Sequence, residues 1–396
     1  MRAGVLGHAV VSDGFLRDEV ASDELDSNEA RDALVRRDSS LPGLGMLLDA
    51  DRLSAALGED VRLTRVRYKP ASSVVVAFQT ADASGWAASY THDDKPAKTL
   101  ARAKVDRPVR RIAGLPHAIT GGVFADRALR AGLRAVERRE PGALQRATVL
   151  RHNPHRRVLL RVGEHVVKVA AGGSGAPGEA DLGALASQGV PLLVPEYWGA
   201  GVTATTHWGI GDLSTHGSDE HAALAGAALA ALHRGAVSAS EPPGIGGAPS
   251  IRTELAAAVA GLVAIDPDFE TPAARIAAAA PTARAHVPLH GDFSADQVLV
   301  GDGIRLIDFD RATTGDPHRD LGSFFAAQIL ATGGEGRGAA LLDGYRSSGG
   351  VVDDETLRQW LAAGLVLRAT EPFRTARAGW HGQVRRILTI AERLLP

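Results

Sequence analysis

Hydrophobic and polar residues alternate in two stretches of the chain that this pattern predicts to be β-hairpins. Residues 61–80 (VRLTRVRYKPASSVVVAFQT) contain two β-rich runs around a Pro-Ala-Ser turn, and residues 85–91 add a third run. Residues 146–172 repeat this arrangement, because two runs flank a Pro-containing turn and a third run follows Gly163. Each stretch therefore predicts three consecutive antiparallel strands.

The two hairpin segments also resemble each other in sequence. When they are placed over each other without gaps, the apolar runs after the two prolines fall in register. The identical pairs include Arg62 with Arg146, Thr64 with Thr148, Arg67 with Arg151 and Pro70 with Pro154. The match predicts either a degenerate internal duplication or convergence on the same hairpin chemistry.

Helical periodicity dominates the remainder of the chain. Residues 95–105 and 124–140 have the spacing of amphipathic helices, and beyond residue 175 the pattern is mainly helical. Ala-rich helices are expected at about 218–236 and 251–280, and further helices are expected from Asp320 to the C-terminus. The chain therefore changes from a β-rich half to a helical half, which indicates an α+β protein.

Composition narrows the possible functions. The 396 residues are 45% hydrophobic and 23% charged, so the chain can bury substantial cores in two or three domains. A net charge of −2 with scattered basic residues gives no indication of a nucleic-acid or membrane partner. The absence of cysteine excludes disulfides, thiolate metal sites and cysteine nucleophiles. No signal-peptide core or bilayer-length apolar stretch is recognisable, which predicts a cytoplasmic protein.

Acidic residues end two neighbouring apolar runs in PLHGDFSADQVLV (residues 288–300) and IRLIDFDRA (304–312). Asp292 is followed five residues later by Gln297, and the run IRLI ends on Asp308-Phe309-Asp310. Protein kinases have an amide five residues beyond the catalytic aspartate and a metal-binding Asp-Phe-Gly after a later strand. Phosphoryl transfer needs a carboxylate to orient the attacking hydroxyl and oxygen ligands for Mg²⁺ at the phosphates. The constellation therefore predicts an ATP site.

Lys168 is the only lysine after residue 104, and it lies in the apolar strand pattern HVVKVA. One interpretation is a water-facing lysine on an edge strand. The other is a strand lysine that contacts nucleotide phosphates, as in protein kinases. Glu179, at the start of the next helical pattern, is the candidate partner of this ammonium, and Asp181 is a competing candidate. Glu179 could instead only stabilise the first turn of a helix.

The segment HGDFSADQVLV followed by IRLIDFDRATTGDPHRDLGSF resembles the Brenner-type motif and metal loop of the aminoglycoside phosphotransferase and choline kinase superfamily. These proteins are small-molecule kinases with a protein-kinase-like fold. The resemblance covers about residues 146–396 and includes GAALAALHRG, which is similar to the family's helix ending in Leu-His. It is closest to the maltokinase and glucosamine-kinase-like branch, since aminoglycoside kinases usually carry asparagine at the position of Gln297.

The resemblance implies a two-lobed, protein-kinase-like α+β fold with an extra N-terminal α/β region, which also occurs in that branch. The expected parts are a cap region at 1–140, which is a candidate N-lobe-like repeat, a β-rich N-lobe at 141–215 and a helical C-lobe at 216–396. Residues 208–213 fall where the hinge between the lobes should contact adenine. His290 and Asp320 would support the catalytic loop structurally.

The resemblance also implies roles for individual residues. Asp292 would be the catalytic base, Gln297 and Asp308 the Mg²⁺ ligands, and Lys168 the phosphate clamp. Asp310 would bind a second metal ion or belong to its shell.

Two features depart from the family pattern. The hairpin before Lys168 has the turn NPHRR instead of GxGxxG, so the loop that covers the phosphates is not identified. Ser294 and Asp296 replace the usual His and Gly of the branch's catalytic loop. These positions could border the acceptor, so the departure concerns the assignment of a sugar more than that of a kinase.

The C-terminal helices should line the acceptor pocket. There, Glu371, Arg374, Trp380 and His381 would suit a sugar through stacking and hydrogen bonds. The alternative is that Trp380 belongs to the core and the charged residues lie on a solvated helix face.

The sequence thus predicts an enzyme that transfers the ATP γ-phosphate to a hydroxyl of a sugar or amino sugar with the help of Mg²⁺. The expected partner is this small-molecule acceptor, without nucleic acid or membrane, and the chain would act as a monomer or homodimer. One alternative is an aminoglycoside or other antibiotic phosphotransferase. Another is a pseudokinase that binds nucleotide without turnover.

Overall fold

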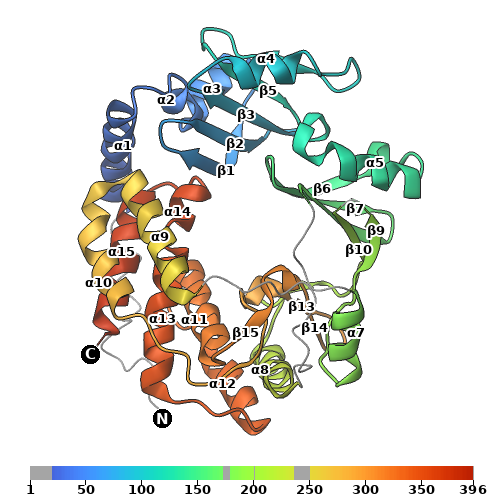
Figure 1. The fold of residues 1–396 in the computed structure, drawn as a ribbon, viewed down its shortest axis with the longest axis vertical. Coiled ribbons are helices and arrows are strands. Elements are labelled where there is room, and N and C mark those ends of the chain that lie inside the picture. Colours follow the sequence, from blue (N-terminus) through green and yellow to red (C-terminus); the bar gives the residue numbers. More distant parts are fainter. Residues whose placement is uncertain (1–19, 173–178, 200, 236–249, 396) are drawn as a thin grey trace.

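Three parts of the chain, two with five-stranded sheets and one mainly helical, each contact the other two in the computed structural model (Figure 1). The model describes residues 20–172, 179–199, 201–235 and 250–395. The arrangement confirms the expected α+β fold, with a β-rich smaller lobe, a mainly helical larger lobe and an additional N-terminal region. None of the helices within the described residues is long and apolar enough to cross a membrane.

The N-terminal cap consists of short helices and an antiparallel sheet with the strand order β1-β2-β3-β5-β4. Its buried side chains Val74, Val76 and Ala87 face the helices, because alternate residues of a strand point to opposite sides of a sheet. The elements are α1 (Val20–Arg37), α2 (Leu44–Leu47), α3 (Ala50–Leu57), β1 (Arg62–Lys69), β2 (Ser73–Gln79), β3 (Ser84–Tyr90), α4 (Asp94–Leu100), β4 (Val109–Arg111) and β5 (Ala118–Gly122).

The N-lobe has a sheet with the order β6-β7-β8-β10-β9, covered on one side by a helix. Val158 and Leu160 are fully buried against the apolar side of that helix, at Leu133 and Val136. The intervening Arg157 and Leu159 therefore face the opposite side, towards the helical lobe. The elements are α5 (Arg130–Arg139), α6 (Ala143–Arg146), β6 (Thr148–Asn153), β7 (Arg157–Val162), β8 (His165–Ala170), α7 (Glu179–Ser187), β9 (Glu196–Gly199) and β10 (Val202–Thr206).

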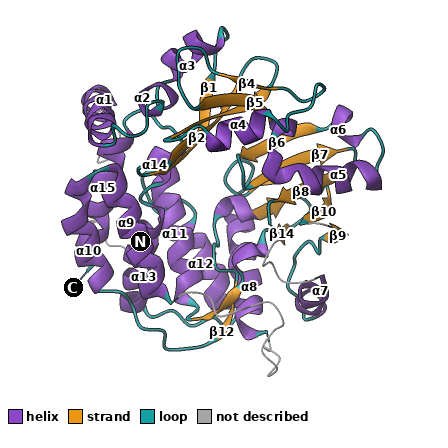
Figure 2. Cartoon of the chain, turned by 45° about the horizontal axis from the view of Figure 1, so that its top comes forward, coloured by secondary structure: helices purple, strands orange, loops and turns teal. Residues whose placement is uncertain are grey.

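The C-lobe is mainly helical (Figure 2). Its helices pack around a buried core that includes Phe293, Phe324 and Leu361. Short strands carry the loops that face the N-lobe. The elements are β11 (Gly211–Asp212), α8 (Asp219–Arg234), α9 (Ile251–Ile265), α10 (Glu270–Ala278), β12 (Val287–Leu289), β13 (Val298–Val300), β14 (Ile304–Leu306), β15 (Thr313–Gly315), α11 (His318–Thr332), α12 (Gly338–Ser347), α13 (Asp354–Arg368), α14 (Glu371–Arg374) and α15 (Trp380–Arg393).

The two five-stranded sheets have the same strand connectivity, and their first hairpins also have the same kind of turn. Both hairpins turn at proline followed by a residue with positive φ, Ala71 (49°) in the cap and His155 (61°) in the N-lobe. In both, a partly or fully buried aspartate accepts a hydrogen bond from the backbone N–H of that residue, Asp38 at 2.9 Å and Asp126 at 2.6 Å. The turns are the ones that the ungapped sequence match places opposite each other.

The structure differs from the sequence expectation at four places. The helix expected over 124–140 begins only at Arg130, after two short 3-10 turns. The helix expected over 251–280 is broken, because Asp266 caps a new turn that begins at Pro267, and proline cannot continue a helix interior. The helix expected over 95–105 ends at Leu100. The strands β4 and β5 were not predicted, since they are short and β5 ends in two glycines without an alternating pattern.

Candidate active site

A cavity of about 650 Å³ lies between the N-lobe sheet and the C-lobe loops. Three of its lining residues, Leu150, Tyr197 and Ile210, are apolar or aromatic side chains that are 46%, 66% and 71% exposed. Exposed hydrophobic residues gathered in one concave site are typical of a small-molecule pocket. The predicted hinge lies here, since Trp208, Ile210, Gly211 and Asp212 all line the cavity. This cavity is therefore the candidate nucleotide site.

Lys168 projects into this cavity from the middle of the N-lobe sheet. Its strand β8 pairs with β7 on one side and β10 on the other, so the interpretation of Lys168 as an edge-strand lysine is wrong. The Nζ atom donates hydrogen bonds to Asp308 Oδ1 at 3.1 Å and to Asp310 Oδ1 at 2.5 Å. The structure thus brings together three residues that the sequence assigned to one site.

A second cation reaches the same two carboxylates. Arg157 Nη1 lies 3.5 Å from Asp308 Oδ2 and 3.5 Å from Asp310 Oδ2. Burial raises the pKa of Asp308, but Lys168 and then Arg157 outweigh burial, so the pKa of this carboxyl is lowered. Asp308 is accordingly held as a carboxylate, with its backbone in the left-handed region at φ 62°.

Gln297 lines the cavity beside these carboxylates. Its backbone carbonyl accepts a hydrogen bond from Ile307 N at 3.0 Å, which fixes the catalytic loop next to the residue that precedes Asp308. Among the described residues there is no group of three or more His, Asp or Glu side chains that could hold a metal ion. Two carboxylates and one amide nevertheless fit Mg²⁺ at a nucleotide, because this ion keeps several waters and uses phosphate oxygens as ligands.

Asp292 lies on the loop after β12 and is held from the helical lobe. Arg368 Nη2, at the end of α13, donates to Asp292 Oδ1 at 2.7 Å and to Ser323 Oγ at 2.8 Å. Arg311 Nε lies 3.9 Å from the other oxygen, Oδ2. The Asp292 side chain remains 40% exposed, so its carboxylate is accessible to a substrate.

A buried network supports the catalytic loop from below. Asp320, which is fully buried, accepts hydrogen bonds from His290 N at 2.7 Å, Gly291 N at 2.8 Å and His233 Nε2 at 3.2 Å. Tyr345 Oη donates to His233 Nδ1 at 2.9 Å. Burial raises the pKa of Asp320, but the bonds from His233 and the loop amide of Gly291 outweigh it and lower this pKa. The contacts match the supporting role expected for Asp320.

His290 and Gly291 fix the shape of the loop itself. The His290 ring is buried and donates from Nε2 to the Ile307 carbonyl at 2.8 Å, which connects the loop to the strand before Asp308. Gly291 has φ 83°, and a Cβ atom there would lie 2.0 Å from the Arg311 carbonyl oxygen. Only glycine fits at this position.

The residues proposed to line an acceptor pocket separate into two groups. Trp380 is buried against Phe373, and His381 is buried and hydrogen-bonded to Asp266 Oδ2 at 2.6 Å, so both belong to the core. Glu371 and Arg374 form an ion pair at 2.9 Å. Because their side chains remain 28% and 44% exposed, Glu371 and Arg374 stay candidates for contact with an acceptor.

Glu371 also connects the C-lobe to the cap. Arg65 Nη1, on β1, donates to Glu371 Oε2 at 3.0 Å, and the two side chains are only 14% and 28% exposed. Burial raises the pKa of Glu371, but Arg65, Arg374 and Arg368 outweigh burial and lower it. The cap therefore contributes a charged residue close to the arginine that holds Asp292.

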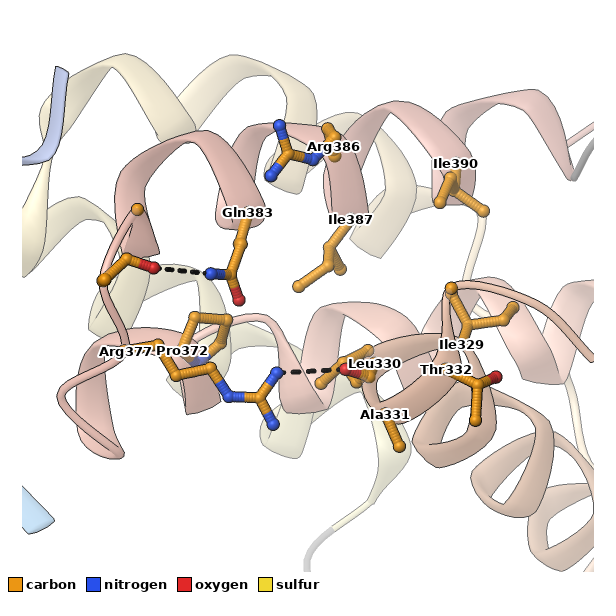
Figure 3. Close-up of a pocket in the computed structure, with 13 residues that line it drawn as sticks. Ile329, Leu330, Ala331, Thr332, Pro372, Arg377, Gln383, Arg386, Ile387 and Ile390 are labelled. Carbon is orange, nitrogen blue, oxygen red and sulfur yellow. Dashed lines mark hydrogen bonds between the residues drawn. The ribbon is translucent and has the colours of Figure 1, made fainter. Parts of the chain in front are cut away.

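Two of the further cavities of the described chain also lie away from the catalytic loop. One, of about 430 Å³, lies between the cap and α15 and is lined by Arg31, Arg62 and Trp380, among others. The other, of about 250 Å³, lies between α11 and α15; there Arg377 donates to the Leu330 carbonyl and Gln383 to the Ala378 carbonyl (Figure 3). Neither is lined by Asp292, Lys168 or Asp308.

The side chain of Glu179 lies outside the described residues, although the residue begins α7 as expected. Sequence reasoning missed Arg157 and Arg368. The alternation of β7 was a signal for Arg157, since this residue is two positions before Leu159 and therefore lies on the same face of the strand, opposite to that of Val158. Arg368 had no such signal, because 76 residues separate it from Asp292.

Comparison with protein-family models matches residues 136–361, more than half of the chain, to the phosphotransferase enzyme family (APH). No curated protein sequence gives a significant match. Among solved structures, an aminoglycoside-3'-phosphotransferase of type VIII is 22% identical with a TM-score of 0.45, and the match covers 61% of this chain and 98% of that one. The choline kinase of Streptococcus pneumoniae is 13% identical with a TM-score of 0.46, covering 66% of this chain and 99% of that one.

Proposed function

The chain belongs to the phosphotransferase enzyme family, and from this premise we propose that it transfers the γ-phosphate of ATP to a hydroxyl group of a sugar or amino sugar. One observation carries the proposal. Lys168, Gln297, Asp308 and Asp310 line a single cavity, and Asp292 lies on the loop that leads to Gln297. These are the groups that phosphoryl transfer from a nucleotide requires.

Each residue has a defined task in this mechanism. Asp308, Gln297 and Asp310 would hold Mg²⁺, which supplies neutralising charge at the nucleotide phosphates. Asp292 accepts the proton of the acceptor hydroxyl through the oxygen that Arg368 leaves available, as the hydroxyl oxygen bonds to the γ-phosphorus and the bond to ADP breaks. Arg368 keeps the carboxylate oriented during this step. Lys168 offsets the charge of the phosphate oxygens.

The charges on the acceptor side support a neutral sugar over an aminoglycoside. Arg311, Arg368 and Arg374 lie at or near Asp292 and Glu371, and both carboxylates are already paired with arginine. A polycationic aminoglycoside would meet like charges here, which disfavours binding. Gln297 at the position of the family's usual asparagine points to the maltokinase and glucosamine-kinase-like branch.

A panel of acceptors tests the proposal. Purified protein is incubated with radiolabelled ATP, Mg²⁺ and separate neutral sugars, amino sugars, aminoglycosides or choline-like alcohols, and transfer of label is measured. We expect transfer to at least one sugar or amino sugar and none to aminoglycosides. Transfer to aminoglycosides alone would support an antibiotic kinase instead. Binding of ATP without transfer to any acceptor would support a pseudokinase.

A further inference from the structure

The hairpin between β6 and β7 occupies the place of a phosphate-covering loop, but it is built differently from a glycine-rich one. No glycine occurs from Asn153 to Arg157. The turn is closed by a hydrogen bond from Arg156 N to the Asn153 carbonyl at 3.0 Å. A glycine-rich loop uses free backbone N–H groups to cradle phosphates, and here the amide of Arg156 is used within the turn.

The tip of this hairpin is also fixed from outside. Asp126 accepts hydrogen bonds from His155 N at 2.6 Å and from the His155 ring at 3.0 Å. The ring of Trp86, on β3 of the cap, packs edge-on against the His155 ring with 5.1 Å between the centroids. The amide of His155 therefore points to Asp126 and is not available to a nucleotide. A side chain has to supply the phosphate contact that the backbone cannot give.

Arg157 is the residue placed to do so. Leu159 pairs with Lys168 across β7 and β8, so Arg157, two residues before Leu159, lies on the same face of the sheet as the lysine. Both cations line the cavity, and both lie within 3.5 Å of Asp308 and Asp310. Two cations thus balance two carboxylates. If Asp308 and Asp310 held a metal ion, the guanidinium of Arg157 and the ammonium of Lys168 would be available to phosphate oxygens.

We propose that Arg157 is a phosphate-binding residue that replaces the glycine-rich loop, with the hairpin held rigid by Asp126. This proposal rests on the proposed function, because it places a nucleotide in the same cavity. A guanidinium suits the role, since its planar donors match phosphate oxygens in a way that an ammonium does not. The site would then recognise the nucleotide by its β- and γ-phosphates and not by its nucleoside alone.

Binding measurements without turnover test the role of Arg157. Isothermal titration of the full chain with AMP-PNP, ADP and AMP, each with Mg²⁺, gives affinities that separate the terminal phosphates from the nucleoside. For Arg157→Ala we expect about tenfold or more weaker binding of AMP-PNP, as for the loss of a charge-assisted hydrogen bond, and less than about twofold change for AMP. Arg157→Lys should recover only part of the loss.

The neighbouring Arg156 provides the matched control. Its side chain is exposed and does not line the cavity, so Arg156→Ala removes the same charge and should leave AMP-PNP binding unchanged. Wild-type affinity for AMP-PNP in Arg157→Ala, or an equal loss in Arg156→Ala, would overturn the role of Arg157 alone. If the wild-type chain bound none of the three nucleotides, the proposed function would fail as well.

Discussion

At the scale of single residues, the site depends on arginines that hold carboxylates in place. Arg368 joins Asp292 to Ser323, and Arg157 joins the hairpin to Asp308 and Asp310. A catalytic carboxylate must be held close to its productive geometry, because small misplacements reduce the rate strongly. Arg368 is therefore expected to act on the chemical step, and Arg157 on nucleotide binding.

Replacing Arg368 should separate these two effects. Arg368→Ala leaves Asp292 without its described hydrogen-bond donor, and we expect kcat to fall about 10- to 100-fold. Binding of AMP-PNP should change less than about twofold, because Arg368 does not line the nucleotide cavity. Steady-state kinetics with an accepted sugar and titration with AMP-PNP measure the two quantities. An unchanged kcat would remove Arg368 from its positioning role.

The sequence could predict the site residues that lie at fixed short spacings. Gln297, Asp308 and Asp310 follow Asp292 within 18 residues, so the backbone itself brings them together. Lys168 was recognisable as a lone lysine in an apolar strand. Arg368 meets Asp292 only through the packing of α13 on the catalytic loop, and no local pattern encodes that contact. The burial of Trp380 and His381 likewise depends on α1 and Asp266 from distant segments.

At the scale of elements, the two anchored hairpins are the main finding, and we propose that the two sheets derive from a duplicated lobe. By the shared turn, Val75 and its partner Ala88 correspond to Leu159 and Lys168. In the cap this pair is buried in an apolar cluster with Trp86. The cap hairpin thus has the same turn and the same anchoring aspartate, but it has no lysine at the position that corresponds to Lys168.

The pH dependence of stability should report the anchor of the N-lobe hairpin. Burial raises the pKa of Asp126, but the neighbouring His152 ring and the hydrogen bonds from His155 outweigh burial and lower this pKa. Because the pKa of Asp126 is lower in the folded than in the unfolded state, its ionised carboxylate stabilises the fold above the unfolded-state pKa of about 3.9. This stabilisation is lost as the pH falls below that value. Asp126→Asn should therefore destabilise by about 1–3 kcal/mol at pH 7. The difference from wild type should shrink below about pH 5.

Urea unfolding midpoints at pH 7 and about pH 3, below the pKa of an unfolded aspartate, measure this difference, and Asp38→Asn is the control. Asp38 anchors the equivalent turn in the cap, so its replacement should also destabilise the protein while leaving AMP-PNP binding intact. Asp126→Asn should weaken AMP-PNP binding as well, because it loosens the turn next to Arg157. A gap between wild type and Asp126→Asn that stays constant from pH 7 to about pH 3 would contradict the assignment.

At the scale of the whole molecule, the cap closes onto both lobes. It meets the N-lobe where Trp86 packs on His155, and the C-lobe where Arg65 pairs with Glu371 and α1 packs on α15 (Figure 1). Glu371 lies near Arg368, the residue that holds Asp292. The Arg65–Glu371 pair therefore connects the cap to Arg368. The cap thus contacts both the β6–β7 hairpin and the C-lobe residues next to Arg368.

The Arg65–Glu371 pair should stabilise the closed arrangement. Removing one partner of a largely buried ion pair leaves the other uncompensated, so Arg65→Ala and Glu371→Gln should each cost about 1–3 kcal/mol. The double variant should lose less stability than the sum of the losses of the two single variants. Arg374→Ala, which removes the more exposed partner of Glu371, should cost less than about 1 kcal/mol. Urea unfolding and hydrogen exchange of β1 amides measure these effects, and strictly additive losses would show that the pair is not coupled.

The most direct measurement for the central claim compares wild type and Asp292→Asn in two assays, transfer of labelled phosphate from ATP to an accepted sugar and binding of AMP-PNP with Mg²⁺. The substitution keeps the size of the side chain but removes the carboxylate that accepts the hydroxyl proton. We predict that transfer falls by at least about 1,000-fold while AMP-PNP affinity stays within about threefold of wild type. Transfer near the wild-type rate in Asp292→Asn would contradict the account.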